Sequence, residues 1–144
     1  MIIPDVNVLI YAYNPNAVGH DRVRQWWEET LNGSPSVALP WVTILGFIRV
    51  STHRRILENP MFPAQAIGLV REWLKLRNVQ MISPGESHAQ ILFALLEDLG
   101  TAGDLTTDAH LAALAIEYQA ELASTDVDFS RFPRLRWFNP LRLR

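Results

Sequence analysis

The sequence of 144 residues predicts an α/β protein, with a three-layer α/β/α arrangement around a central, mostly parallel sheet. Short apolar runs alternate with longer segments in which apolar residues recur at helical spacing, as in βαβ units. The short runs are mostly apolar and do not alternate with polar residues, which is typical of parallel strands that are covered on both faces. The length suits one domain with a sizeable core, so we expect residues 1–144 to form a single domain.

The order of these segments gives the expected elements. Strands are expected at residues 2–4, 37–39, 79–82, 122–124 and 135–138. Helices are expected at about residues 6–13, 20–31, 41–51, 63–77, 86–99 and 107–118. Pro63 suits the first position of its helix, and Gly100 follows the last apolar residue of another. Parallel sheets place their sites at the carboxyl ends of the strands, so polar residues there are the first candidates for function.

Composition excludes several classes of protein. The chain has no cysteine, so disulfide frameworks and thiolate metal sites are excluded. The N-terminus has no basic segment before its apolar residues and reaches Asp5 at once, unlike a secretory signal. No apolar run has the length of a membrane span. We therefore expect a cytoplasmic protein with no membrane partner.

Arginine dominates the basic residues, since Lys75 is the only lysine among 13. The formal net charge of −2 does not indicate a nucleic-acid-binding protein as a whole. Arg49, Arg54 and Arg55 nevertheless form a local cluster, and arginine suits two-point contact with phosphate better than lysine. The alternative is a general bias of the genome toward arginine codons.

Asp5 follows the first expected strand directly. One interpretation is that it caps the helix that begins at Val6, a role that Asn7 could share. The other is that it lies at the site edge of the sheet. Taken alone, the position favours the cap.

Three other acids have similar positions. Asp108 stands in the first turn of a helix, where a negative charge is favourable. Alanines at 109, 112, 113 and 115 would let this helix lie close to the sheet. Asp126 and Asp128 follow the expected strand 122–124, in a segment that also suits a plain turn.

Together, three separate segments would bring carboxylates to one edge of the sheet. Two like charges about 4 Å apart repel by roughly 4 kcal/mol at a surface-like dielectric. Such a group needs protons or a hard cation, and oxygen ligands favour Mg²⁺ or Mn²⁺ over Zn²⁺. The sequence therefore predicts a metal site that includes Asp5, Asp108 and Asp126.

The motifs that carry these acids resemble those of PIN-domain nucleases. The opening Asp5-Val6-Asn7-Val8-Leu9-Ile10 is similar to their first motif. The segment that begins at Asp108-Ala109-His110 resembles their third acidic motif, and Ser124-Thr125-Asp126-Val127-Asp128-Phe129 resembles the last. Length and order resemble the bacterial VapC toxins of type II toxin–antitoxin systems.

The resemblance implies a metal-dependent endoribonuclease that hydrolyses phosphodiester bonds, with Mg²⁺, for which Mn²⁺ can substitute. It also implies a homodimer and a VapB-type antitoxin. Asp5, Asp108, Asp126 and Asp128 would be the catalytic acids, and Arg49, Arg54 and Arg55 would contact the RNA backbone. Asn7 and Asp104 are auxiliary candidates; Asp104 is also a candidate N-cap.

One departure from the family pattern concerns its second acid, usually a glutamate in the helix after strand two. Residues 41–50 contain no carboxylate, and Gly46 stands nearest to the expected position. This departure predicts about one weakly bound metal ion rather than a pair. It also leaves open a degenerate PIN domain that binds RNA or a protein partner without cleaving.

A receiver-like signalling domain is a further alternative, because that fold also gathers aspartates around Mg²⁺. A receiver needs paired acids after the first strand, an aspartate after the third and a late lysine. This chain has one aspartate after the first strand and Ser83-Pro84-Gly85 after the third. The pattern disfavours a receiver.

Overall fold

The computed structural model describes residues 1–142. Its strands are β1 (Ile2–Pro4), β2 (Val37–Pro40), β3 (Val79–Ile82), β4 (Glu121–Ala123) and β5 (Trp137–Phe138). Its α-helices are α1 (Val6–Tyr13), α2 (His20–Leu31), α3 (Trp41–Ser51), α4 (Pro63–Leu74), α5 (His88–Leu99) and α6 (Thr106–Glu117). Two 3₁₀ helices, η1 (Gly103–Leu105) and η2 (Val127–Arg131), precede α6 and follow β4. None of the described helices is both long and apolar enough to cross a membrane.

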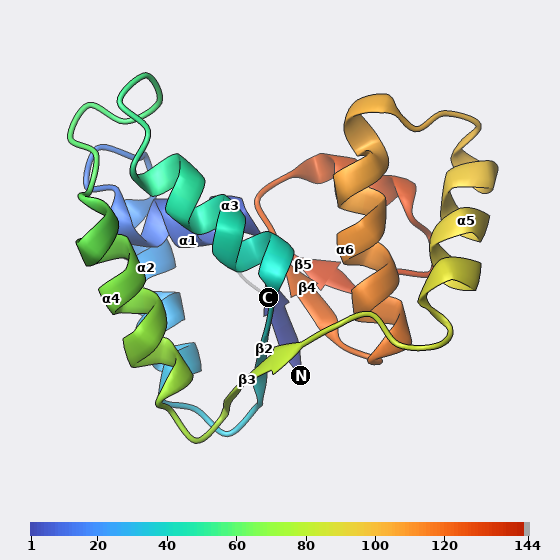
Figure 1. The fold of residues 1–144 in the computed structure, drawn as a ribbon, viewed down its shortest axis with the longest axis horizontal. Helices are drawn as coiled ribbons and strands as arrows, with labels where there is room; N and C mark the ends of the chain where they lie inside the picture. The colour runs from blue at the N-terminus through green and yellow to red at the C-terminus, as the bar shows by residue number, and fades with distance from the viewer. Residues whose placement is uncertain (143–144) are drawn as a thin grey trace.

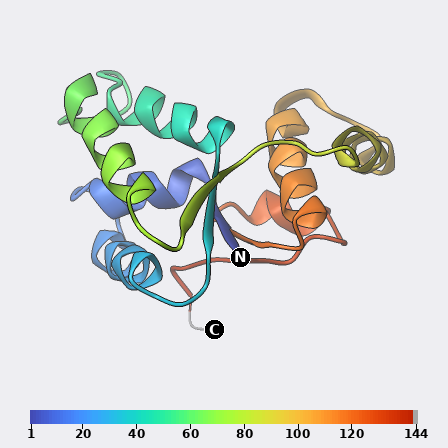
Figure 2. The same ribbon diagram turned by 60° about the horizontal axis from the view of Figure 1, so that its bottom comes forward.

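The strands form one sheet in the order β3-β2-β1-β4-β5, and every neighbouring pair is parallel. The first strand of the chain therefore lies at the centre of the sheet, between β2 and β4 (Figures 1 and 2). In the register of β1 and β4, Pro4 lies opposite Ala123. The residues that follow these two, Asp5 and Ser124, are thus side by side at the carboxyl edge of the sheet.

Helices cover both faces of the sheet, as the sequence predicts. Figure 1 shows α1 to α4 on one side and α5 and α6 on the other. Strand side chains alternate between the two cores: Ala38 packs with α5 and α6, whereas Val37 and Leu39 pack with α1 to α4. The alanines of α6 at 109, 112, 113 and 115 are fully buried, so this helix does lie close to its neighbours, as expected.

Most predicted boundaries match the structure to within two residues. The bounds of α1, α2, α3 and β3 match the prediction. Helix α4 ends at Leu74 rather than near Arg77, and α5 begins at His88 rather than Glu86. The last strand is shorter than predicted and contains only Trp137 and Phe138. The two 3₁₀ helices were not predicted, because such short turns have no hydrophobic period to reveal them.

Candidate active site

Asp5 lies at the end of β1, and both interpretations of its position hold. Its backbone N–H donates to the carbonyl of Ala123 at 2.9 Å, which ties it to β4. Its carboxylate Oδ1 accepts a hydrogen bond from the N–H of Val6 at 2.8 Å, so Asp5 is the N-cap of α1. Only 9% of the residue is exposed. Burial raises the pKa of the Asp5 carboxyl. The hydrogen bonds from Ser124 and Val6 lower this pKa in part, and the charge of Asp126 raises it.

Ser124 joins the first and last acidic motifs. It is fully buried, and its hydroxyl donates to Oδ2 of Asp5 at 2.8 Å. Oγ of Ser124 also accepts hydrogen bonds from the backbone N–H of Asp126 at 3.0 Å and from Nδ2 of Asn7 at 3.3 Å. Sequence reasoning missed this residue because only the β1–β4 register reveals its neighbours. Its signal was a small polar residue directly after a buried strand and next to the acidic motif.

Asn7 does not share the capping role, since Asp5 alone caps α1 with its side chain. Its Oδ1 instead accepts from the backbone N–H of Thr125 at 3.2 Å. The first turn of α1 is therefore linked to the loop after β4 by Asn7, and to the end of β4 by Asp5. These hydrogen bonds connect two segments that are more than 100 residues apart in the chain.

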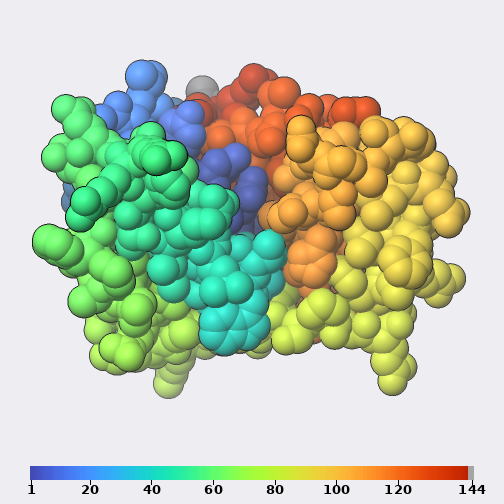
Figure 3. Space-filling view, turned by 45° about the horizontal axis from the view of Figure 1, so that its top comes forward, coloured from blue at the N-terminus to red at the C-terminus, as the bar shows by residue number. Residues whose placement is uncertain are grey.

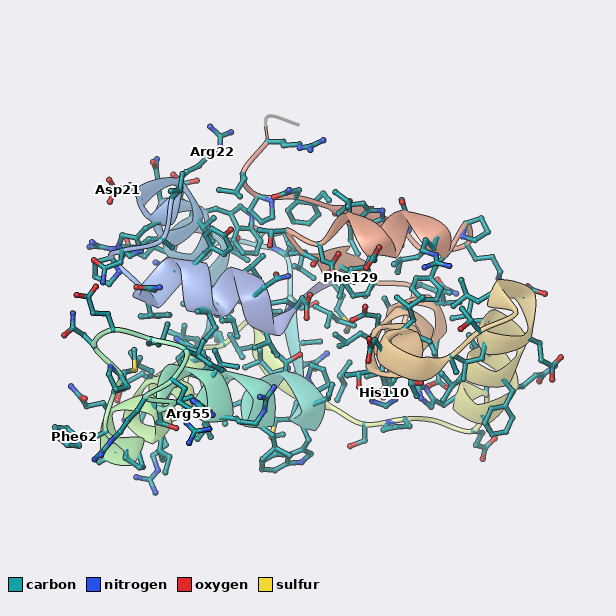
Figure 4. The ribbon with its side chains drawn as sticks, turned by 90° about the horizontal axis from the view of Figure 1, so that it is seen from above. Asp21, Arg22, Arg55, Phe62, His110 and Phe129 are labelled. Carbon is teal, nitrogen blue, oxygen red and sulfur yellow. The ribbon has the colours of Figure 1, made fainter. Side chains whose placement is uncertain are left out.

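Asp126 begins the 3₁₀ helix η2. Its Oδ1 accepts from the backbone N–H of Asp128 at 2.9 Å, a short-range turn typical of aspartate. Phe129, which Figure 4 labels, is fully buried and anchors η2 in the core beside α6. Asp126 is half-buried and Asp128 is exposed. The charge of Asp126 raises the pKa of both Asp5 and Asp108, whereas the charge of Asp128 raises the pKa of Asp108.

Asp108 stands in the first turn of α6 and is half-buried. Its pKa is raised from 3.8 to about 6, first by burial and then by the charges of Asp5, Asp126 and Asp128. The close packing of α6 brings this first turn toward the ends of β1 and β4. The structure therefore gathers the four predicted acids into one electrostatically coupled group. Figure 3 shows the surface hollowed between the α3 side and the α6 side, with atoms from the N-terminal part of the chain on its floor.

The donor set of this group fits a hard divalent cation, because it offers only oxygen ligands whose negative charges repel one another. No three His, Cys, Asp or Glu side chains within residues 1–142 already converge on one point that would hold an ion. The acids therefore do not form a closed cage. A cation bound here would keep several water ligands, as Mg²⁺ commonly does.

Asp104 is not brought to this group, contrary to one sequence expectation. It lies in η1 and is exposed, and α6 begins only at Thr106, so it does not share a helix face with Asp108. Nor does it cap α6, whose N-cap is Leu105 with no side-chain hydrogen bond. Asp104 is therefore in the 3₁₀ turn that precedes α6, and it is not among the charges that raise the pKa of Asp108.

The predicted arginines lie on the α3 side of the molecule. Arg49 is exposed in the last turn of α3, and Arg54 and Arg55 are exposed in the turn that follows. Figure 4 shows Arg55 near the end of α3, whereas His110 lies across the molecule on α6. Helix α3 begins where β2 ends, so these arginines lie at its far end from the sheet. None of them is among the charges that shift the pKa of Asp5 or Asp108.

His110 of α6 contacts a histidine of α5. Its Nδ1 lies 2.9 Å from Nε2 of the buried His88, which joins α6 to α5. Burial, and then His88, lowers the pKa of His110. A structural contact between two helices accounts for this residue.

A separate cavity of about 330 Å³ lies between α2 and the C-terminal segment. Its lining includes Arg22, Trp26 and Phe138 but none of the four acids. Because catalysis depends on reactive groups rather than on volume alone, the acidic group is the better candidate for the active site.

Comparison with known proteins shows the family of the chain. A sequence model of the PIN domain family matches residues 2–135. Ribonuclease VapC33 of Mycobacterium tuberculosis is 46% identical over 142 residues, which cover 99% of each chain.

Solved structures share the fold at lower identity. In the structure of VapBC2 from Rickettsia felis bound to a DNA fragment from its promoter, the matching chain has a TM-score of 0.69 and 20% identity, covering 96% of this chain and 98% of that one. A toxin–antitoxin complex from Klebsiella pneumoniae contains a chain with a TM-score of 0.63 and 18% identity, covering 97% and 98%. With the acids at the carboxyl edge of a five-stranded parallel sheet, the chain belongs to the VapC ribonucleases of the PIN domain family.

Proposed function

We propose that this chain is the toxin of a toxin–antitoxin pair and hydrolyses phosphodiester bonds within RNA in a Mg²⁺-dependent reaction. The observation that carries the proposal is the electrostatic repulsion among Asp5, Asp108 and Asp126 at the carboxyl edge of the sheet, which raises the pKa of Asp5 and Asp108. The relatives named VapC ribonuclease and the toxin–antitoxin complexes of the same fold support it. Cytoplasmic RNA is the expected substrate.

In this reaction, water adds across one P–O bond and leaves a phosphate monoester and a hydroxyl group. A bound Mg²⁺ supplies the chemistry of lowering the pKa of a coordinated water and of neutralising charge on the phosphate. Asp5, Asp108 and Asp126 would hold that ion, and Asp128 would add negative charge from the rim. Ser124 keeps Oδ2 of Asp5 oriented through its hydrogen bond at 2.8 Å.

The RNA backbone would be held by cationic side chains outside the acidic group. Arg49, Arg54 and Arg55 are exposed and can reach phosphate groups along the α3 side. A VapB-type antitoxin is the expected protein partner, and a homodimer is the expected assembly.

The test is cleavage of RNA by the purified chain with Mg²⁺, with Mn²⁺ and with excess EDTA. We expect cleavage only with the metals, and none from an Asp5→Asn variant purified in the same way. Cleavage that persists in EDTA would refute the metal mechanism. RNA binding without cleavage under all conditions would support the alternative of a degenerate PIN domain, which the absence of a carboxylate between residues 41 and 50 motivates.

Growth provides an independent test of the toxin role. Expression of the wild-type chain should inhibit growth, and Asp5→Asn should not. Co-expression of the protein encoded by a short adjacent upstream reading frame should relieve the inhibition. Normal growth with abundant wild-type chain and intact RNA would exclude a toxin.

A further inference from the structure

Gly46 lies in the middle of α3 and is buried. Glycine destabilises a helix interior relative to alanine, because it loses more backbone freedom on folding. A glycine at such a position therefore calls for a packing reason. The reason is the first residue of α1, which packs against α3.

A Cβ atom added at Gly46 would lie 2.4 Å from Cγ2 of Val6, and 3.4 Å from both Cβ and Cγ1 of the same side chain. The first distance is far below a van der Waals contact between carbon atoms. Valine is branched at Cβ and has few rotamers in a helix, so it cannot easily turn aside. Even alanine at position 46 would force α1 and α3 apart or strain Val6.

Helix α3 holds the same part of the chain at a second point. The hydroxyl of the buried Thr43 donates to the backbone carbonyl of Pro4 at 3.0 Å. Thr43 and Gly46 are three positions apart, so they share one face of α3. That face contacts the residue before Asp5 through Thr43 and the residue after Asp5 through Gly46.

We propose that Val6 and Gly46 form a steric pair that positions Asp5 and keeps α3 from supplying a metal ligand. The pair holds Val6, whose N–H donates to Oδ1 of Asp5 at 2.8 Å. The part of the proposal that concerns the metal ligand rests on the proposed function, and the steric part does not. It explains the missing second acid physically: the space that a glutamate side chain would cross on leaving α3 is filled by Val6.

A pair of this kind predicts that the effect of a substitution at one position depends on the residue at the other. With Val6 present, Gly46→Ala should lower Tm by about 3–10 °C, because it overpacks the contact. In a Val6→Ala background the clash is removed, so Gly46→Ala should raise Tm by about 3 °C through better helix propensity. Gly68 on α4 is the matched control, because a Cβ there would meet nothing within 4 Å. Gly68→Ala should raise Tm in both backgrounds.

Metal binding tests the second half of the proposal. The double variant Val6→Ala/Gly46→Glu should bind Mn²⁺ more tightly than Val6→Ala, or bind a second ion, in calorimetry and in electron paramagnetic resonance. Val6→Ala/Gly46→Gln has the same size without the charge and should show no gain. Gly46→Glu with Val6 retained should bind Mn²⁺ no better than the wild type.

The outcomes separate the two proposals. An equal effect of Gly46→Ala on Tm in both backgrounds would overturn the steric pair, whatever the chain does to RNA. A gain in Mn²⁺ affinity from Gly46→Glu with Val6 retained would overturn the exclusion of a ligand. If the wild type neither binds Mn²⁺ nor cleaves RNA while the sign of the Tm effect reverses as expected, the steric pair stands and the proposed function fails.

Discussion

The hydroxyl of Ser124 donates to Oδ2 of Asp5 at 2.8 Å although the two residues are 119 positions apart in the chain. This bond compensates in part for the burial of the Asp5 carboxylate, since a hydrogen bond to the charged form lowers the pKa that burial raises. It also fixes which way one oxygen of Asp5 faces, so Ser124 is a positioning residue for a proposed metal ligand.

Ser124→Ala should reduce cleavage while leaving the chain folded. A buried carboxylate oxygen without its donor costs about 1–3 kcal/mol, and the pKa of Asp5 should rise. At a fixed low Mg²⁺ concentration, the pH dependence of cleavage should shift upward relative to the wild type. Ser124→Thr retains the hydroxyl and should restore the wild-type profile. A pH profile for Ser124→Ala that matches the wild type would show that the bond is only structural.

Asp5→Asn should abolish cleavage without unfolding the chain. Asparagine caps helices as well as aspartate does, so α1 should keep its N-terminus, and removal of a buried charge should keep Tm at or above the wild-type value. Asp21→Asn is the matched control, because Asp21 is an exposed acid in the first turn of α2. Normal cleavage by Asp5→Asn, measured with the same RNA, would leave Asp5 as a cap alone.

Stability without metal should fall as the pH rises from about 5 to about 7.5. The pKa of Asp108 is about 6 in the folded chain, against 3.8 for the free side chain, and burial raises that of Asp5 as well. At a pH between the unfolded and folded pKa of a carboxyl, the folded chain binds more protons than the unfolded chain. Raising the pH therefore favours unfolding.

Thermal melts in EDTA at the two pH values check this prediction. Asp108→Asn removes one of the titrating groups, so the loss of stability with rising pH should be smaller in this variant than in the wild type. Other titrating groups contribute equally to both proteins and cancel in this comparison. Saturating Mg²⁺ should stabilise the chain more at the higher pH, because it binds the ionised carboxylates. An identical pH dependence for wild type and Asp108→Asn would contradict the raised pKa.

We expect about one Mn²⁺ per chain, and we expect Asp126 to matter more than Asp104 for binding it. Affinity for hard cations falls as anionic ligands are removed. Asp126→Asn should therefore weaken binding strongly, whereas Asp104→Asn should leave it unchanged, because Asp104 lies in η1 outside the coupled group. Calorimetry on the three proteins decides the point. Two tightly bound ions in the wild type, or a large decrease in affinity with Asp104→Asn, would show that the ligand set is different.

Arg49, Arg54 and Arg55 should contribute to RNA affinity by binding phosphate groups. Removing one arginine that binds a phosphate should reduce the slope of log affinity against log salt by about 0.7 for single-stranded RNA. Binding is best measured in the Asp5→Asn background, so that the RNA stays intact. Arg→Gln at each position is compared with Arg71→Gln, which changes an exposed arginine of α4. A salt slope that none of the three substitutions changes would place the RNA elsewhere.

Much of the fold could be predicted from the sequence, because most of its strand residues are apolar and buried and its helices have a clear apolar period. The candidate acids could be found for a related reason: Asp5 directly follows β1, and Asp126 lies in the loop after β4, where parallel sheets place their sites. Their roles in metal binding and cleavage stay predictions. What the structure adds is that Asp108 joins them electrostatically.

Other features depended on distances that no sequence pattern encodes. Ser124 gains its role from the β1–β4 register, and Gly46 from its approach to Val6. Asp104 lies in a 3₁₀ turn just before α6, and such a turn has no hydrophobic period that a sequence could reveal. Short turns and side-chain contacts between distant segments set these positions.

The central place of β1 in the sheet has a consequence for how the chain is made. Residues 2–4 leave the ribosome early, but one of their two neighbouring strands, Glu121–Ala123, is synthesised near the end of the described chain. Until that strand emerges, Asp5 lacks Ser124 and Asp126, and Asp108 lacks its partners. A nascent chain of this topology therefore cannot assemble the proposed acidic site until residues 121–126 have been synthesised.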